Sequence, residues 1–213
     1  MRCHRPKEHL AEMSAGNIAI IDSGGANIAS LLYALKRQGT TATLTTNARV
    51  ISSADRIILP GVGAARDAMT RLRDKNLLDV IRNLTQPVLG ICLGMQLLAA
   101  ASEEEDVECL GIIPGIAKKL PADTACPVPN MGWCAITRTR DHEVLTGIDD
   151  GAYFYFLHSF ALPVSGYTVA DATHAEPFSA VVSHRNFMAA QFHPERSSSA
   201  GARLLQNFVG MKS

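Results

Sequence analysis

The stretch Pro87-Val-Leu-Gly-Ile-Cys-Leu-Gly-Met-Gln-Leu-Leu98 passes from a strand pattern to a helix pattern at a single cysteine, Cys92. The apolar residues before Cys92 predict a buried strand, and residues 93–101 predict a helix. Gly90 and Gly94 flank the cysteine at the spacing of a strand-to-helix elbow, in which the chain turns sharply without a Cβ clash. Such an elbow presents its central residue at the carboxyl end of the strand, where open α/β sheets bind ligands, and the helix N-terminus beneath it favours a thiolate. The pattern makes Cys92 a candidate nucleophile, with an inert buried cysteine as the alternative.

Strand and helix patterns alternate on both sides of this elbow. We expect strands at residues 17–21, 41–46, 56–59, 87–91, 115–120, 153–157, 167–172, 179–183 and 187–191, and helices at residues 28–38, 64–75, 93–101 and 198–209. The first half predicts a mainly parallel sheet with helices on both faces, and the short strands of the second half predict an antiparallel flank. Because no linker or internal repeat divides the chain, residues 17–213 are predicted to form one α/β domain behind a polar tail, residues 1–16, of unknown order.

Charge and cysteine content limit the function further. The 213 residues include 47 % apolar and 19 % charged side chains, as in a globular domain rather than a disordered chain. The 20 Lys and Arg residues balance 20 Asp and Glu residues, whereas proteins that bind nucleic acid usually carry a basic excess. No apolar run approaches the roughly 20 residues that span a bilayer, and residues 1–16 lack the apolar segment of a signal peptide. The five cysteines include no C-x-x-C pair, which argues against a disulfide framework or a zinc site and favours a cytoplasmic location.

A second motif, Gln191-Phe-His-Pro-Glu-Arg196, carries the base that a cysteine nucleophile needs. A catalytic thiolate requires a histidine within hydrogen-bond reach and a further group that orients the imidazole. His193 and Glu195 are two residues apart, so both side chains can point to one side at the end of a strand. The alternatives are that His193 is a surface histidine beside a carboxylate, or that another histidine at a strand end, His158 or His184, is the base.

The third motif is the glycine-rich turn Pro60-Gly-Val-Gly63, which follows one predicted strand and precedes a helix. Glycine permits backbone conformations in which N–H groups converge on an anion, as in an oxyanion hole for a tetrahedral intermediate. A phosphate cradle is disfavoured, because the G-x-x-x-x-G-K-[ST] pattern and its lysine are missing. The alternative is an ordinary tight turn.

In this order, the glycine-rich turn, the cysteine elbow and the His-x-Glu motif resemble those of the class I, triad-type glutamine amidotransferases. Further segments are similar to one branch of that family, the glutaminase subunits of imidazole glycerol phosphate synthases, which serve histidine biosynthesis. The similar segments are residues 17–27, 59–63, 87–98, 131–133, 151–159 and 191–197, so the resemblance extends from Asn17 to about Val209. It implies the flavodoxin-like fold of the class I glutamine amidotransferases.

The resemblance also implies a role for each matching residue. Cys92 attacks the side-chain amide of glutamine, His193 activates the thiol and protonates the departing ammonia, and Glu195 orients the histidine. The backbone N–H groups of Gly61, Val62 and Leu93 form the oxyanion hole, after the glycine-rich turn has rearranged. Glutamine is bound by Gly63, Gln96, Glu104, His158, Ser159 and Phe160. Glu103 and Glu105 are expected to be solvated charges, and the resemblance implies no metal and no cofactor.

The same resemblance implies a heterodimer with a (βα)8-barrel cyclase subunit, which receives the ammonia through its interior. The implied partner contacts are Asn27, Met131, Trp133, Tyr155 and Arg196. The family usually has His and Asn where Asn130 and Cys134 stand in this chain, and often Tyr where Phe160 stands. We expect Asn130 and Cys134 to face the partner, where they would alter docking or activation.

Three other functions fit part of the pattern. A stand-alone cysteine hydrolase would turn over peptides or simple amides without a partner. Another amidotransferase assembly, for vitamin or aromatic synthesis, would share the triad but not the Met-Gly-Trp segment. A degenerate regulatory subunit would lack a member of the triad, whereas this sequence retains Cys92, His193 and Glu195. Ammonia release from glutamine with and without the cyclase separates these functions.

Overall fold

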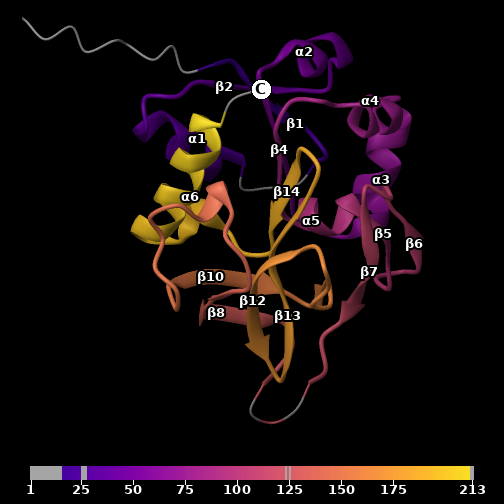
Figure 1. Ribbon diagram of the computed structural model, residues 1–213. Coiled ribbons are helices and arrows are strands. Elements are labelled where there is room, and N and C mark those ends of the chain that lie inside the picture. Colours follow the sequence, from indigo (N-terminus) through magenta and orange to yellow (C-terminus); the bar gives the residue numbers. More distant parts are fainter. Residues whose placement is uncertain (1–15, 25–27, 123, 125, 212–213) are drawn as a thin grey trace, which may run out of the picture.

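The computed structural model describes residues 16–24, 28–122, 124 and 126–211, and its centre is an eight-stranded sheet in the order β2-β1-β3-β4-β14-β13-β12-β9 (Figure 1). The strands are β1 Ile18–Ile21, β2 Ala42–Thr45, β3 Arg56–Gly61, β4 Val88–Cys92, β9 Thr137–Arg138, β12 Thr168–His174, β13 Glu176–His184 and β14 Phe187–Ala190. The five strands from β2 to β14 are parallel, and β13, β12 and β9 continue the sheet antiparallel. The parallel strands have the flavodoxin-like order. The predicted α/β class and its antiparallel flank are therefore confirmed.

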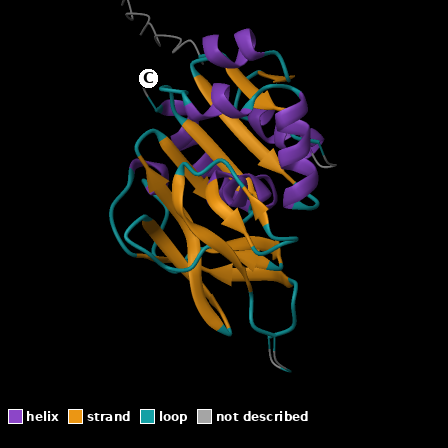
Figure 2. Ribbon diagram, turned by 90° about the vertical axis from the view of Figure 1, so that its right-hand side faces the viewer, coloured by secondary structure: helices purple, strands orange, loops and turns teal. Residues whose placement is uncertain are grey.

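Helices cover both faces of the parallel strands and form two hydrophobic cores with them. The helices are α1 Ile28–Arg37, α2 Ala48–Ser53, α3 Ala65–Asp74, α4 Leu78–Arg82, α5 Leu93–Leu98 and α6 Ser198–Gly210. Helices α1 and α6 bury Leu35 and Phe208 in one core, and α3 buries Met69 and Leu72 in the other. Figure 2 shows the helices around the parallel half of the sheet, with the antiparallel strands extending beyond them.

The sequence patterns explain this burial. Every residue of β1 and β4 is buried, as expected for parallel strands that are covered on both faces. In α1, Leu31, Ala34 and Leu35 are buried while Tyr33 is exposed, which matches the helical spacing of the apolar residues. Because β4 is enclosed by both cores, the position of Cys92 at its end is fixed by the packing of the whole domain.

A second sheet corrects one predicted helix. The helix expected over residues 93–101 ends at Leu98, and the next four residues form strand β5 Ala99–Ser102. Alanine favours a helix locally, but tertiary pairing outweighs that preference. Here β5 pairs in parallel with β7 and antiparallel with β6. This sheet has the order β11-β7-β5-β6, with β6 Val107–Glu108, β7 Ile113–Lys119 and β11 Phe160–Ala161.

A third sheet consists of two antiparallel strands, β8 Asn130–Ala135 and β10 Tyr153–His158. Alternation along β10 places Phe154 and Phe156 in the core and leaves the intervening residues at the surface. The short helices η1 Glu143–Leu145 and η2 Pro194–Arg196 complete the described elements. Strand β10 and helix η2 pack against each other, so the third sheet adjoins the Gln191–Arg196 motif.

Candidate active site

Cys92 occupies a strained turn between β4 and α5. Its backbone has φ 53° and ψ −111°, a region that L-residues rarely adopt and that is typical of a nucleophile elbow. A Cβ atom at Gly94 would lie 1.8 Å from the carbonyl oxygen of Leu59, and one at Gly90 would lie 2.9 Å from the side chain of Leu98. Both glycines are therefore required for α5 to pack directly on the strands, as the spacing around Cys92 predicted.

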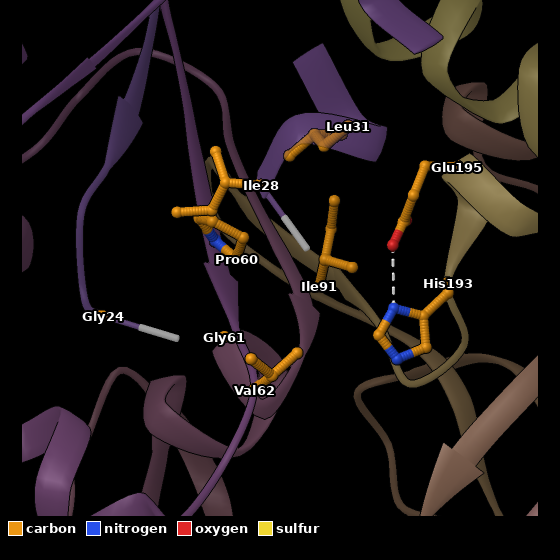
Figure 3. A pocket seen from close by; sticks show the side chains of 9 residues that line it. All are labelled: Gly24, Ile28, Leu31, Pro60, Gly61, Val62, Ile91, His193 and Glu195. Carbon is orange, nitrogen blue, oxygen red and sulfur yellow. Dashed lines mark hydrogen bonds and ion pairs between the residues drawn. The ribbon is translucent and has the colours of Figure 1, made fainter. Parts of the chain in front are cut away.

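His193 and Glu195 form a buried pair beside this elbow. His193 Nδ1 lies 2.9 Å from Glu195 Oε1, and each side chain is only 5 % exposed. The main chain of His193 is held as well, because its N–H donates to the Tyr155 carbonyl and its carbonyl accepts from the Ser197 hydroxyl. Figure 3 shows the imidazole with Nδ1 toward Glu195 and its other nitrogen directed away from it. The carboxylate thus orients the ring and leaves Nε2 for another partner.

The other partner of His193 is Cys92. Burial by itself lowers the pKa of His193, but hydrogen bonds to Cys92 and Glu195 and the charges of both residues raise it to about 10. His193 therefore faces the Cys92 sulfur, which itself lies 3.6 Å from the Leu157 carbonyl oxygen, and the imidazole is placed to take the thiol proton. The structure thus joins two motifs that are about 100 residues apart in the sequence.

The other strand-end histidines are engaged elsewhere. His158 Nδ1 lies 3.0 Å from the carbonyl oxygen of Phe160, and its Nε2 lies 3.1 Å from Asn130 Nδ2. Burial, together with the charges of His174 and His193, lowers the pKa of His158 to about 4, so it is neutral at pH 7. His184 packs edge-on against Tyr167, with 4.9 Å between ring centroids.

A pocket of about 430 Å³ opens beside Cys92 and His193. It is lined by Val62, Gly63, Cys92, Leu93, Gln96, Glu104, Pro129, Leu157, His158, Ser159, Phe160, His193 and Arg196. All six residues that the resemblance assigned to glutamine binding are therefore placed around one cavity, which we call the main pocket. Pro129 and Leu157 line it as well, although no motif pointed to either residue.

Two predicted substrate residues have defined hydrogen bonds. Gln96 Nε2 donates to the carbonyl oxygen of Phe160 over 3.0 Å, and Glu104 Oε2 accepts from the Ala65 N–H over 2.9 Å. The neighbouring Glu103 and Glu105 are exposed, as expected, although each has a partner: the Lys119 N–H and the Arg66 side chain, respectively.

The glycine-rich turn Pro60–Gly63, called the strap from here on, runs past the nucleophile. Gly61 ends β3 opposite Cys92, and a Cβ atom on it would lie 2.9 Å from the Leu93 Cβ. Gly63 is exposed and has φ 95°, which favours glycine. A small cavity of about 20 Å³ separates the strap from His193 and Glu195 (Figure 3). All three residues predicted for the oxyanion hole, Gly61, Val62 and Leu93, thus lie close to the nucleophile.

Gln191, which no sequence pattern singled out, contacts the nucleophile. Its side chain is fully buried, and its Nε2 lies 3.9 Å from the Cys92 sulfur. Its Oε1 is buried and makes no hydrogen bond within the described part of the chain. The residue sits next to the β14–β4 pairing, in which Ala190 is opposite Ile91. Its position two residues before His193 was the one feature of the sequence that pointed to a place near the active site.

The predicted partner contacts gather on the outer side of β8 and β10. Met131 is 67 % exposed and Trp133 51 %, while Arg196 lies over the ring of Tyr155 with 4.6 Å between its Cζ and the centroid. Tyr153 and Leu157, which the resemblance did not assign, extend the same surface. We call this surface the apolar face; it consists of Met131, Trp133, Tyr153, Tyr155 and Leu157. Asn27, also predicted as a contact, lies outside the described residues.

Asn130 and Cys134 do not face outward, contrary to expectation. Asn130 is 2 % exposed, and Cys134 Sγ points toward its Oδ1 at 3.6 Å. Because residues alternate along a strand, these two side chains lie on the inner side of β8 when Met131 and Trp133 lie on the outer side. Their nearest functional neighbour is His158 of the main pocket.

The described residues hold neither a candidate metal site nor a helix that could span a membrane. Among the residues that the structure describes, no group of three or more His, Cys, Asp or Glu side chains is placed to hold a metal ion. No helix in the same part of the chain is long and apolar enough to cross a membrane.

Known proteins that resemble this chain in sequence or in fold include several glutamine amidotransferases. Residues 19–211 match the sequence profile of glutamine amidotransferase class-I. Imidazole glycerol phosphate synthase subunit HisH of Vibrio cholerae is 45 % identical over 199 residues, which cover 91 % of this chain and 98 % of the relative. The protein of that name from Xanthomonas axonopodis pv. citri is 48 % identical over 195 residues, with coverage of 92 % and 98 %. A crystal structure of a glutamine amidotransferase shares the fold, with a TM-score of 0.70 at 16 % identity over 91 % of this chain and 99 % of the other.

Proposed function

The chain belongs to the glutamine amidotransferase class-I family, and from this premise we propose that it is the glutaminase subunit of an imidazole glycerol phosphate synthase, acting in histidine biosynthesis. The observation that carries the proposal is Cys92 on its strained elbow, in the same pocket as His193 of the His193–Glu195 pair and as Gln96 and Glu104. The identity of 45 % and 48 % to HisH subunits over nearly their whole length supports the same assignment.

The reaction begins at the Cys92 sulfur. The thiolate attacks the carboxamide carbon of the glutamine side chain, and the carbonyl π electrons move onto oxygen to give a tetrahedral intermediate. The imidazolium of His193 then donates its proton to the departing nitrogen, so that the C–N bond breaks and ammonia leaves a thioester on Cys92. His193, now neutral, takes a proton from water, which attacks the thioester and releases glutamate. Glu195 holds the ring through Nδ1 in both steps.

The oxyanion of both intermediates needs donors beside Cys92. The N–H of Leu93 lies at the start of α5, next to the nucleophile, and the peptide between Gly61 and Val62 runs along the opposite side. Removing one such donor typically slows catalysis by roughly 10²–10³. The glycines of the strap allow this peptide to rotate, so we place the activating rearrangement there.

Recognition of glutamine falls to the remaining lining of the main pocket. Glu104 supplies a carboxylate for the substrate ammonium, and Gln96 is oriented by its bond to the Phe160 carbonyl. We assign the substrate carboxylate to the backbone of His158, Ser159 and Phe160 and to Gly63, which line the same pocket. Polar groups of the pocket lining thus meet both charges of the glutamine zwitterion.

Free ammonia is protonated and lost in water, so the product needs a protected route to a second active site. We assign the apolar face, with Arg196, as the docking surface for the cyclase subunit of the synthase, which we take to be a (βα)8 barrel. Exposed Trp, Tyr and Met side chains with a neighbouring Arg have the composition of interface hot spots. The two chains form a heterodimer in which ammonia passes directly into the cyclase.

Ammonia release from glutamine tests this function. We expect slow release by the isolated chain and strong stimulation by the cyclase subunit with its nucleotide substrate bound. Cys92→Ala should abolish release while the far-UV circular dichroism stays unchanged. Equal release with and without the cyclase would contradict the synthase assignment, and turnover of peptides would point to a stand-alone hydrolase.

A further inference from the structure

Helix α3 begins without a capping side chain of its own. Its N-cap residue, Ala64, has φ −89° and ψ 143°, angles suited to a capping residue, but a methyl group cannot accept a hydrogen bond. Glu104, 39 residues away in the sequence, supplies the acceptor, because its Oε2 lies 2.9 Å from the Ala65 nitrogen. A carboxylate is a strong acceptor at this place, since it also meets the positive end of the helix dipole.

The turn that carries Glu104 is fixed on both sides. The Glu104 N–H donates to the hydroxyl of Ser102 over 3.2 Å, which closes the turn after β5. The next residue, Glu105, forms an ion pair of 3.1 Å with Arg66. Two consecutive residues of the turn therefore hold two consecutive residues at the start of α3.

The strap leads into this contact through Ala64. Gly61 is fixed at its other end by pairing with Cys92, and α3 starts at Ala65. Three residues, Val62 to Ala64, thus connect two fixed points, and the second point depends on Glu104. The Glu104 side chain also lines the main pocket, so one carboxylate contacts both the pocket and the anchor of the strap.

We propose that Glu104 is a positioning residue for the strap, whose carboxylate holds the start of α3 and accepts a hydrogen bond from the glutamine ammonium at the same time. A carboxylate has about four acceptor positions, so both donors can be accommodated. Because they share one group, a shift of the carboxylate toward the ammonium is passed to Ala65 and to the strap before it. The inference rests on the proposed function and adds that occupancy of the pocket is transmitted to the oxyanion donors through Glu104.

Two substitutions at Glu104 separate its two contacts. Glu104→Gln keeps a neutral acceptor for Ala65 but loses the charge that pairs with the ammonium, so KM for glutamine should rise about tenfold or more while kcat stays within about threefold. Glu104→Ala loses both contacts, so kcat should fall about tenfold in addition. Both constants are measured with saturating cyclase subunit and nucleotide. Glu103→Ala is the matched control, because it removes a carboxylate of the same turn that binds the Lys119 N–H at 2.9 Å outside the pocket.

A second substitution tests the anchor directly. Ala64→Ser gives α3 its own cap on the N–H of Arg66 or Asp67. Added to Glu104→Ala, it should restore most of the lost kcat while KM stays high. Amide hydrogen exchange at residues 61–66 without substrate should be faster in Glu104→Ala and slower again in the double variant.

Several outcomes would overturn the inference. In Glu104→Ala, an unchanged kcat with a raised KM would make Glu104 a substrate ligand alone. In the double variant, recovered hydrogen-exchange protection without recovered kcat would show that the anchor does not position the strap. If the wild-type complex released no ammonia at all, the proposed function would fail, whereas the exchange measurement would still report on the anchor.

Discussion

Asn130 Nδ2 lies 3.1 Å from His158 Nε2, and both side chains are buried. Because Nε2 faces a donor, it is the acceptor of a neutral ring, and Nδ1–H then donates to the Phe160 carbonyl over 3.0 Å. The same carbonyl accepts from Gln96 at 3.0 Å. A chain of hydrogen bonds thus leads from the inner side of β8 to the lining of the main pocket.

Asn130→Leu should destabilise the protein, because it leaves the buried His158 Nε2 without a donor. We expect a loss of about 1–3 kcal/mol in the free energy of unfolding, measured by urea denaturation. KM for glutamine should also rise, since Phe160 and Gln96 lose part of their support. Cys134→Ala is the control, because its sulfur lies 3.6 Å from Asn130 Oδ1 and takes no part in the bond to His158. An equal loss in both variants would count against a specific role for Asn130.

The pKa of His158 predicts how stability depends on pH. In the folded protein the pKa is lowered to about 4, whereas an unfolded chain has the ordinary value of about 6.5. The unfolded state therefore binds the proton more readily, and the stabilising contribution present above pH 6.5 is lost as the pH falls toward 4. Urea midpoints between pH 4 and 7.5 should fall less steeply in His158→Gln than in the wild type, and parallel curves would rule out His158 as the source.

The local sequence pattern was sufficient to predict the fold where residues close together in the sequence determine the structure. The strand before Cys92, the elbow and the start of the following helix all depend on residues within a few positions of one another. The end of that helix could not be predicted, because Ala99–Ser102 become a strand only through pairing with β6 and β7.

The residues of the site also fall into those that the sequence identifies and those that only the structure brings together. Cys92, His193 and Glu195 carry side chains whose chemistry is rare enough to read from the sequence. The bond from Ala65 to Glu104 and the contact of Asn130 with His158 join residues 39 and 28 positions apart, and no periodicity reports such pairs. The inward direction of Asn130 could have been inferred from the alternation with Met131 once β8 was recognised as a strand.

Gln191→Leu should impair chemistry without impairing stability. The change removes the amide donor 3.9 Å from the Cys92 sulfur, so the thiolate loses a partner and kcat should fall about tenfold. It also removes a buried acceptor, Oε1, that has no partner in the described residues, so the free energy of unfolding should hold or rise. KM should stay near the wild-type value, because Gln191 is not among the residues of the main pocket. A parallel loss of stability and activity would instead indicate a packing role.

Gly201→Ala should displace the turn that carries the base and its carboxylate. A Cβ atom at position 201 would lie 2.0 Å from the carbonyl oxygen of Pro194, the residue between His193 and Glu195. We expect kcat to fall about tenfold or more, since small displacements of catalytic groups cost that much. Gly210→Ala in the same helix is the control, because a Cβ there would meet no atom of the described chain within 4 Å. The control should retain full activity, and a Gly201→Ala enzyme with wild-type kcat would show that the turn moves without consequence.

Trp133→Ala should weaken binding of the cyclase subunit more than the removal of a similarly exposed apolar side chain outside the apolar face. Trp133 is 51 % exposed and contacts Tyr155 edge-on, with 6.1 Å between ring centroids. Arg196 lies over the ring of Tyr155. Hot-spot residues of this type contribute about 2 kcal/mol or more, so Kd should rise about 30-fold in calorimetric titrations. Ile116→Ala is the control, since Ile116 is similarly exposed at 46 % but lies on β7, outside the apolar face. Equal weakening by both changes would place the interface elsewhere, whereas loss of binding in Trp133→Ala alone would locate it on β8 and β10.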